Sequence, residues 1–339
     1  MSAEAVAGSR RVAIIGAGSW GTALAMAAAR NQHHVVLWAR EPEVASAINQ
    51  AHRNPLYLSD FVLENIRATT NIEEAVDAAD FALLVVPSHA MREIISRLLP
   101  SLNNKVVLVS AAKGVENSTL MRMEEVVADV LRERFEPRYV ALSGPSFARE
   151  VAEGDPTAIV AASRDREASE LVQLSLSSNV FRVYTNTDVV GTELGGAVKN
   201  VVAIAAGVVR GLGFGTNAVA AIITRGLAEM TRLALAEGAR VETMAGLAGL
   251  GDLVLTCTGE LSRNRHVGVE LGRGRRLEEI LGGMREVAEG VKTTRSIFEL
   301  GRRLGIEMPI TASIHALLYE DKPALDAANE LMGRPLKRE

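Results

Sequence analysis

One short segment near the N-terminus constrains the fold of this chain more than any other feature. Residues Arg11–Ile15 form an apolar run typical of a buried strand, and Gly16, Gly18 and Gly21 follow in the spacing G-x-G-x-x-G. Good helix formers occupy residues 24–29. Strand, glycine turn and helix in this order are typical of a turn that holds a dinucleotide pyrophosphate at a helix N-terminus. The plainer alternative is a glycine-rich turn with no ligand.

The rest of the first half alternates strand-like runs with helical patterns. Continuous runs of Val, Leu and Ile favour strands of a parallel sheet that is covered on both faces. The expected strands are Val35–Leu37, Phe81–Val86, Val106–Val109, Tyr139–Leu142, Thr157–Val160 and, as a last one, Phe181–Tyr184. Right-handed crossovers between such strands predict an α/β fold with a doubly wound, Rossmann-like sheet.

The second half of the chain changes character and is dominated by helical periodicity. Residues Ala197–Val209 are apolar nearly all round, which predicts a helix buried at the centre of a domain. Further helices are expected at Leu277–Met284, Thr293–Leu304 and Ala324–Leu331. We therefore expect two domains: a dinucleotide-binding domain over residues 1–188 and an all-α domain for substrate binding and catalysis over residues 189–339.

Composition narrows the class of protein. Thirty-seven Lys and Arg residues stand against 41 Asp and Glu, a net charge of −4, and no basic block favours nucleic acid as a partner. Cys257 is the one cysteine, which excludes an internal disulfide and favours a reducing compartment. The first ten residues are too polar for a signal peptide, and the apolar run 201–209 is too short to span a bilayer. We expect a cytoplasmic enzyme without a transmembrane segment.

Candidate site residues follow the expected strands, where ligands bind in open α/β sheets. Arg40 stands where an acidic residue would bind a ribose 2′-hydroxyl, so it is expected to face a 2′-phosphate. Glu41 follows directly and would weaken that preference, which leaves the choice between NADPH and NADH open. Lys113 follows a later strand, and the small-residue loop 143–148 follows the next.

The strongest catalytic candidate is Lys199, which interrupts the apolar helix. Burying a lysine without a partner or a role is costly or lowers its pKa. The alternative is a stem that extends to solvent. Further on, Ser262, Arg263 and Asn264 offer a guanidinium fork beside two hydrogen-bonding groups, which suits a phosphate. No His, Cys or carboxylate cluster has the spacing of metal ligands, so no metal is expected.

A set of motifs spread over residues 11–334 is similar to one known family. The motifs are GAGSWGTALA (16–25), VVPSHAMREII (85–95), AAKG (111–114), LSGPSFAREV (142–151), FRVYTN (181–186), ELGGAVKNVVAIAAG (193–207), TRGLAEM (224–230), LAGLGDLVLTCTG (247–259), LSRNRHVG (261–268) and MPIT (308–311). Together they resemble the bacterial NAD(P)-dependent glycerol-3-phosphate dehydrogenase family. The family interconverts dihydroxyacetone phosphate and sn-glycerol 3-phosphate with NADPH or NADH, and supplies glycerol 3-phosphate for phospholipid synthesis.

The resemblance also implies roles for individual residues. The family's proton donor and acceptor falls on Lys199. Its substrate contacts fall on Lys113, Gly144, Ser146, Lys199, Asp252, Ser262, Arg263 and Asn264. Its cofactor contacts, beside the glycine turn, fall on Ser19, Trp20, Arg40, Tyr57, Lys113, Ala148, Arg263, Val287 and Glu289. The chain departs from many relatives at Glu41, where they carry a second basic residue, and at Ser59, where they carry proline.

Residues and resemblance predict the same mechanism. Lys199, as an ammonium, would donate the proton while Lys113 stabilises the carbonyl oxygen, and the two lysines would lower each other's pKa. Asp252 and Asn200 are expected to orient Lys199. Two other functions stay open: a related two-domain reductase for a small carboxylated acid, and a non-catalytic NADPH-sensing module. A homodimer is left open as the assembly state.

Overall fold

The computed structural model describes residues 8–284 and 288–335. Contacts divide the chain into two compact units, each described here by itself. The first unit holds residues Met1–Ala112 and Met123–Thr192, and the second holds Lys113–Arg122 and Glu193–Glu339. A short piece from the middle of the first half therefore belongs with the helical second half.

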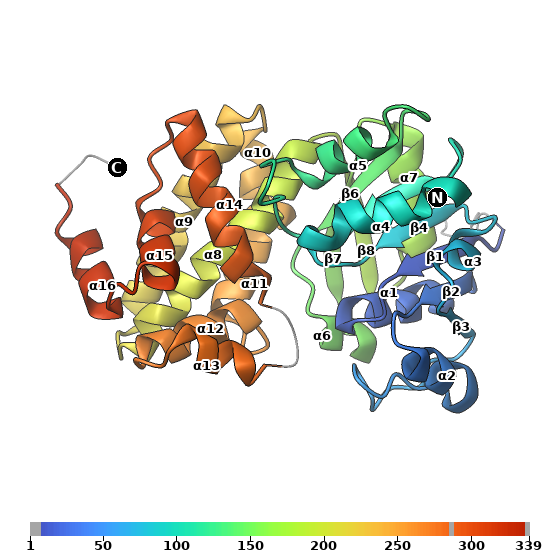
Figure 1. Ribbon diagram of the computed structural model, residues 1–339, viewed down its shortest axis with the longest axis horizontal. Coiled ribbons are helices and arrows are strands. Elements are labelled where there is room, and N and C mark those ends of the chain that lie inside the picture. Colours follow the sequence, from blue (N-terminus) through green and yellow to red (C-terminus); the bar gives the residue numbers. More distant parts are fainter. Residues whose placement is uncertain (1–7, 285–287, 336–339) are drawn as a thin grey trace. The chain divides into compact units, whose positions relative to one another are not determined.

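The first unit is built on an eight-stranded sheet with the order β3-β2-β1-β4-β5-β6-β7-β8 (Figure 1). Its strands are β1 (Arg11–Ile15), β2 (His34–Trp38), β3 (Ile66–Thr69), β4 (Phe81–Leu84), β5 (Val107–Ser110), β6 (Arg138–Ser143), β7 (Thr157–Ala162) and β8 (Phe181–Asn186). The doubly wound sheet confirms the predicted fold class. Each predicted strand is present, with bounds that differ by a few residues.

Two features of the sheet differ from the sequence-based expectation. β3 was not expected, because it is a four-residue edge strand with a charged residue, Arg67, in its middle. β7 pairs antiparallel to β6, in the register Leu142 to Ala161, whereas the strands were expected to be parallel. A buried run of Ala and Val is compatible with either direction, since both faces of this sheet are covered.

Seven helices cover the described part of the first unit. They are α1 (Ser19–Arg30), α2 (Pro42–Ala51), α3 (Ile72–Val76), α4 (Met91–Leu98), α5 (Met123–Leu131), α6 (Ala148–Glu153) and α7 (Arg166–Leu176). α1, α6 and α7 pack together over one set of alternate strand side chains, including Val12 and Ile14. α3, α4 and α5 form a second group of packed helices. Alternation along the strands thus gives each face of the sheet its own apolar core.

The described residues of the second unit are helices joined by loops, apart from segment 113–122, in which Val115 and Arg122 form an isolated β-bridge (Figure 1). Its helices are α8 (Val189–Gly211), α9 (Thr216–Ala236), α10 (Val241–Ala245), α11 (Asp252–Thr258), α12 (Arg263–Gly272), α13 (Leu277–Gly282), α14 (Glu289–Leu304), α15 (Pro309–Tyr319) and α16 (Ala324–Met332). α8 contains the predicted central helix and is buried along nearly its whole length. Within the described residues it alone is long and apolar enough to cross a membrane, and its most apolar window is wholly buried by protein.

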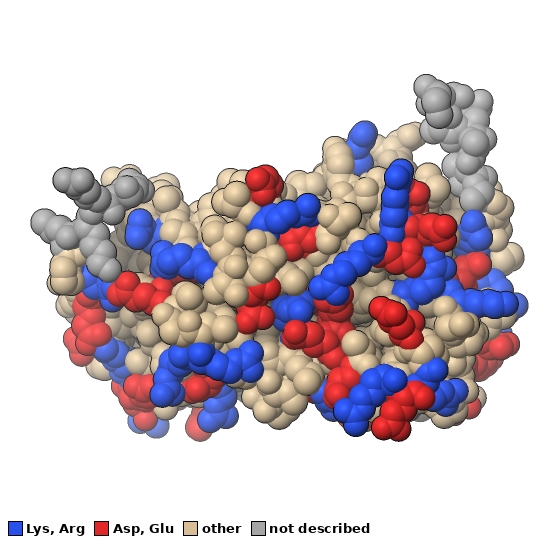
Figure 2. Space-filling view, turned by 90° about the horizontal axis from the view of Figure 1, so that it is seen from above, with Lys and Arg blue, Asp and Glu red and all other residues tan. Residues whose placement is uncertain are grey.

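Charged side chains are distributed over the surface. On the face shown in Figure 2, basic and acidic side chains are interspersed over the described residues. Several exposed side chains form short-range ion pairs, such as Arg166 with Glu170 at 2.6 Å and Arg302 with Glu299 at 3.4 Å. Such exposed pairs contribute little to stability, typically about 0–1 kcal/mol each.

Candidate active site

The glycine turn joins β1 to α1 and has the shape that a pyrophosphate needs. Gly16 has φ +120°, and a Cβ there would lie 2.3 Å from the carbonyl oxygen of Val85. A Cβ on Gly21 would lie 1.8 Å from the carbonyl oxygen of Gly16. A Cβ on Gly18, by contrast, would meet nothing within 4 Å, so this position leaves an open approach to the backbone. These residues fit a dinucleotide at the N-terminus of α1.

Three predicted cofactor contacts follow this turn or the neighbouring strand. Ser19 and Trp20 are the first two residues of α1. Arg40 lies two residues beyond β2, and the Gly16 N–H donates to the carbonyl of Trp38 at 3.2 Å, which ties the turn to that strand. The Arg40 side chain is 81% exposed and donates to Glu41 Oε1 from Nε at 3.0 Å and from Nη2 at 2.8 Å. Glu41 therefore occupies the guanidinium fork that was predicted to bind a 2′-phosphate.

Asn54 supports the same turn and was missed by the sequence analysis. Its side chain is fully buried and donates from Nδ2 to the carbonyl of Ala17 and to Thr22 Oγ1, both at 2.9 Å. Its Oδ1 accepts from the backbone N–H of Tyr57 at 3.1 Å. Asn54 thus joins the segment of Tyr57, a predicted cofactor contact, to the glycine turn. The Asn-Pro dipeptide at 54–55 was the available signal, but it indicates only a turn.

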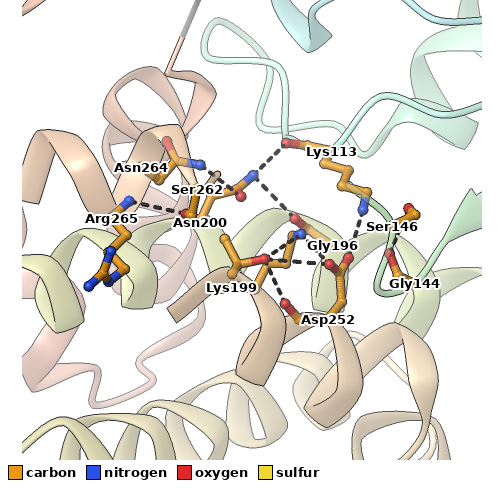
Figure 3. A network of polar contacts seen from close by, with 11 residues as sticks. Lys113, Gly144, Ser146, Gly196, Lys199, Asn200, Asp252, Ser262, Asn264 and Arg265 are labelled. Atoms are coloured by element: carbon orange, nitrogen blue, oxygen red, sulfur yellow. Dashed lines mark hydrogen bonds and ion pairs between the residues drawn. The ribbon is translucent and has the colours of Figure 1, made fainter. Parts of the chain in front are cut away.

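The predicted contacts after β6 lie in one tight turn. Gly144 has φ +136°, and a Cβ there would lie 2.9 Å from the Cα of Ile159 on the neighbouring strand. Ser146 Oγ donates to the carbonyl of Gly144 at 3.1 Å (Figure 3). Ala148 is the first residue of α6. The close approach of β7 therefore requires glycine at position 144.

The second unit gathers two lysines around one aspartate (Figure 3). Lys199 on α8 is 7% exposed, and Asp252 at the start of α11 is 1% exposed. Lys199 Nζ donates to Asp252 Oδ1, and Lys113 Nζ donates to Asp252 Oδ2 at 2.7 Å. Each carboxylate oxygen thus accepts from a different ammonium. The partner of Lys199 is buried with it, so its stem does not extend to solvent.

Burial and charge together determine the protonation of this cluster. Burial lowers the pKa of Lys199 to about 7; the Asp252 carboxylate opposes this, and the positive charge of Lys113 reinforces it. Burial alone would raise the pKa of Asp252, but the two ammonium groups outweigh burial, and its pKa lies below the usual range. Asp252 is therefore a carboxylate near neutral pH, while Lys199 is able to give or take a proton.

Thr256 is a further member of this cluster that the sequence analysis did not identify. Its Oγ1 accepts from Lys199 Nζ at 2.8 Å and donates to the carbonyl of Asp252 at 2.6 Å. Because the hydroxyl proton is used by that carbonyl, the oxygen faces Lys199 as an acceptor. Thr256 lies four residues after Asp252, one turn of helix α11, and this spacing was the signal that could have identified it.

A chain of amide groups connects four segments beside the cluster. Asn200 Nδ2 lies 3.5 Å from the carbonyl of Lys113 and 3.4 Å from that of Gly196. Asn264 Nδ2 donates to Asn200 Oδ1 at 2.9 Å, and Asn264 Oδ1 accepts from the Gly290 N–H at 2.9 Å. The Asn264 amide, predicted to contact substrate, is thus 8% exposed and bonded within the protein.

The remaining predicted contacts lie at two helix N-termini. Ser262 caps α12, where its Oγ accepts from the Arg265 N–H at 3.2 Å, and Arg263 is the exposed first residue of that helix. Glu289 is the first residue of α14. Val287 lies outside the described residues. Cap and guanidinium together place anion-binding groups at the start of α12.

Two pairs of glycines allow α12 to cross α8 at very short distance. A Cβ on Gly207 of α8 would lie 2.1 Å from the carbonyl of Arg265, and one on Gly268 of α12 would lie 2.0 Å from that of Ile204. Gly211 and Gly272 face each other in the same way one turn further on. This crossing brings the start of α12 to the helix that carries Lys199.

The described residues hold no group of three or more His, Cys, Asp and Glu side chains placed to bind a metal ion. They hold a glycine turn of the dinucleotide-binding type in the first unit and a buried lysine with a pKa lowered to about 7 in the second. The fold and the glycine turn define the class: a nicotinamide-dinucleotide-dependent oxidoreductase.

Comparisons with known proteins identify the family. The models for the N-terminus and C-terminus of NAD-dependent glycerol-3-phosphate dehydrogenase match residues 11–169 and 188–329. A glycerol-3-phosphate dehydrogenase [NAD(P)+] of Koribacter versatilis is 55% identical over 96% of this chain and 97% of its own. One from Geobacter sulfurreducens is 54% identical over 98% and 99%. The chain belongs to the NAD-dependent glycerol-3-phosphate dehydrogenase family.

A solved structure agrees with this assignment. The crystal structure of glycerol-3-phosphate dehydrogenase from Coxiella burnetii has a TM-score of 0.91 and 40% identity, and the match covers 96% of this chain and 99% of that one. Sheet unit and helical unit are both included in that match. The predicted family, fold class and enzyme class are therefore confirmed.

Proposed function

We propose that this enzyme uses NADPH or NADH to reduce dihydroxyacetone phosphate to sn-glycerol 3-phosphate, and that it catalyses the reverse reaction. The observation that carries the proposal is Lys199, which is buried against Asp252 with a pKa lowered to about 7. A ketone needs a proton at its oxygen as charge develops there, and a group titrating near neutral pH is suited to deliver it.

The chain's own residues divide this task among them. Lys199, as an ammonium, donates its proton to the substrate carbonyl oxygen, and Lys113 stabilises the charge on that oxygen. Asp252 accepts from both ammonium groups, and Thr256 accepts from Lys199. These bonds fix the position of Lys199 Nζ and leave its third N–H for the substrate. In the reverse direction the neutral Lys199 amine takes the proton from the alcohol. The roles of these residues are part of the proposal.

The cofactor is proposed to bind at the glycine turn of the first unit. Gly16, Gly18 and Gly21 would hold the pyrophosphate at the start of α1, and Arg40 would lie toward the ribose. When bound, the nicotinamide supplies or accepts the hydride. Asn54 would keep the turn in shape, since it bonds to Ala17 and Thr22 from the neighbouring segment.

The substrate phosphate is proposed to bind at the start of α12. Ser262 caps this helix and Arg263 offers a planar fork, a geometry that suits a phosphate. Asn264 supports the site through its bonds to Asn200 and Gly290 rather than through a free amide. Family membership favours a phosphorylated ketone over the carboxylated substrate of a related reductase.

One assay tests the proposal directly. Oxidation of NADPH and of NADH is measured with dihydroxyacetone phosphate, unphosphorylated dihydroxyacetone and a small 2-oxo acid. We expect turnover with the phosphorylated ketone to exceed the other two strongly. Arg263→Lys keeps the charge but loses the fork, so it is expected to weaken binding of dihydroxyacetone phosphate by about 1–3 kcal/mol. Equal turnover of all three substrates would overturn the substrate assignment.

The use of the product, the cellular compartment and the assembly state are also proposals. The product would supply phospholipid synthesis, in the cytoplasm, with residues 1–188 and 189–339 as the two functional domains. The single cysteine, Cys257, is buried and unpaired, as suits a reducing compartment. A homodimer is the assembly state that sedimentation would test.

A further inference from the structure

A buried ion pair outside the lysine cluster attaches the segment that carries Lys113. Arg122 Nη1 donates to Glu193 Oε2 at 2.9 Å, and the two side chains are only 7% and 3% exposed. Both residues belong to the second unit, as Lys113 does. A charge pair taken this far from water is costly to bury and is a weak source of stability, so its place in the fold needs another reason.

Arg122 and Lys113 are the two ends of one compact segment, 113–122. Val115 and Arg122 form an antiparallel bridge. Inside the segment, the Glu116 N–H donates to the carbonyl of Met121 at 2.9 Å, and the Leu120 N–H donates to that of Glu116 at 2.8 Å. These bonds tie the ends together. Because Val115 lies two residues after Lys113, a displacement of Arg122 is expected to move Lys113 as well.

The segment contacts helix α8 at two points on one face. Glu193 binds Arg122, and Asn200, seven residues further on, lies against the carbonyl of Lys113 at 3.5 Å. Seven residues are two helical turns, or about 10 Å along the axis. Lys199 is the neighbour of the second contact. Two attachment points prevent the segment from rotating about either one, so the Lys113 side chain approaches Asp252 from a defined direction.

We propose that the Arg122–Glu193 ion pair is a positioning element of the active site: it attaches segment 113–122 to α8 and holds Lys113 against Asp252, opposite Lys199. The proposal rests on the roles proposed above for Lys113 and Lys199. Neither Arg122 nor Glu193 acts on the substrate itself. Their effect on catalysis passes through the position of the Lys113 ammonium, whose charge is one of the causes that lower the pKa of Lys199.

The test uses Arg122→Lys, Arg122→Met and the double variant Arg122→Met with Glu193→Met. The double variant removes both charges of the pair, so neither Arg122 nor Glu193 leaves the other as a buried charge without its partner, and its folding is checked by Tm. We expect kcat to fall about 10- to 100-fold in the two Met variants, as for a catalytic group displaced by about 1 Å. Arg122→Lys should retain most of the activity. The Kd for NADPH is measured beside kcat; because the glycine turn is unchanged, any loss of NADPH affinity should be smaller than the loss in kcat.

The pH profile distinguishes positioning from simple destabilisation. When Lys113 moves away, its positive charge no longer lowers the pKa of Lys199, so the pKa in the profile of kcat/KM should rise. Glu229→Gln is the matched control. Glu229 is 1% exposed in the same unit and accepts from the N–H groups of Ile310 at 2.6 Å and Thr311 at 3.2 Å. Its loss should lower Tm and leave the profile unchanged.

Two outcomes would overturn the proposal. One is a folded double variant with normal kcat and a normal pH profile; the other is a control, Glu229→Gln, that shifts the profile equally. Lys199→Ala and Lys113→Ala are measured beside them. Normal turnover in these two would instead refute the proposed function, so that the two failures are distinguishable.

Discussion

The glycine turn and the lysine cluster are built from different parts of the chain, the first from backbone and the second from side chains. The turn is made of backbone within six consecutive residues, and it depends on glycines because a Cβ on Gly16 or Gly21 would collide with a backbone carbonyl. The cluster is made of side chains from distant segments: Lys113 and Asp252 lie 139 residues apart, and Lys199 and Asp252 lie 53 apart. The first site depends on local chain geometry, and the second depends on the packing of a whole unit.

This difference determines which chemistry each site is able to perform. A turn of backbone N–H groups at a helix N-terminus binds an anion whose charge is fixed. It has no group that titrates near neutral pH. The cluster, because it is buried, moves the pKa of Lys199 into that range. Binding of a cofactor thus needs only an open turn, whereas proton transfer needs a packed core.

The largest expected effect comes from removing the titrating group. Lys199→Ala should lower kcat by about 10²–10⁴-fold, the usual contribution of a positioned proton donor. The Kd for NADPH should stay nearly unchanged, because the glycine turn does not depend on the cluster. Steady-state kinetics and fluorescence titration measure the two quantities. Lys292→Ala, an exposed lysine on α14, is the control. Near-normal turnover of Lys199→Ala would remove Lys199 from the mechanism.

The pH dependence tests the same group without a mutation. With a pKa of about 7, Lys199 loses its proton as pH rises through 7. Ketone reduction needs the ammonium, so its kcat/KM should fall about tenfold per pH unit well above 7. Alcohol oxidation needs the neutral amine and should rise through the same range. Profiles of both directions that change in the same sense would contradict the assignment of one shared acid–base group.

A substitution in the glycine turn is expected to weaken NADPH binding, whereas Lys199→Ala is expected to lower kcat. A Cβ on Gly18 meets nothing within 4 Å, so Gly18→Ala should leave Tm unchanged. The methyl group would occupy the approach of the pyrophosphate and weaken NADPH binding by about 1–3 kcal/mol, as overpacking does. Gly215→Ala, at another glycine with open space, is the control for the loss of glycine itself. Unchanged affinity in Gly18→Ala would show that the pyrophosphate binds elsewhere.

The contrast also explains how much the sequence revealed. The glycine positions of the turn were predictable, because their fingerprint is local and each glycine has its own geometric reason. Lys199 was chosen as a candidate because a charge is out of place in an apolar helix; the structure shows it buried against Asp252, and its role stays a prediction. Thr256 and Asn54 were missed, since a buried threonine and an asparagine before proline are each ordinary on their own. Their importance comes from partners that only the fold brings near.

The same limit applies to the sheet and to segment 113–122. Strand positions follow from apolar runs, but the antiparallel direction of β7 depends on the path of the chain between strands. Arg122 and Glu193 have no local signature, because an ion pair between positions 71 residues apart has no periodicity to detect. Local patterns thus predict elements and single anomalies, while the arrangement of partners needs the structure.

The smallest expected effect concerns Glu41, and it tests whether the first unit uses any side chain for specificity. Glu41 accepts from two nitrogens of the Arg40 fork, at 3.0 and 2.8 Å, and it places a negative charge beside the expected 2′-phosphate. Glu41→Gln would release the fork and remove that charge. Because the pair is exposed, we expect NADPH to bind more tightly by only about 0.2–1 kcal/mol, and NADH to bind as before.

The controls for Glu41 separate the ion pair from general electrostatics. Glu43→Gln changes the net charge equally two residues away and is also exposed. Fluorescence titration of NADPH and NADH needs no turnover, and raising the salt concentration should reduce the effect, since exposed charges are screened. Equal tightening by Glu43→Gln would mean that only the net charge matters. A gain confined to Glu41→Gln, and abolished by Arg40→Ala, would show that in this enzyme the side chain after β2 adjusts cofactor choice while the backbone turn supplies the binding.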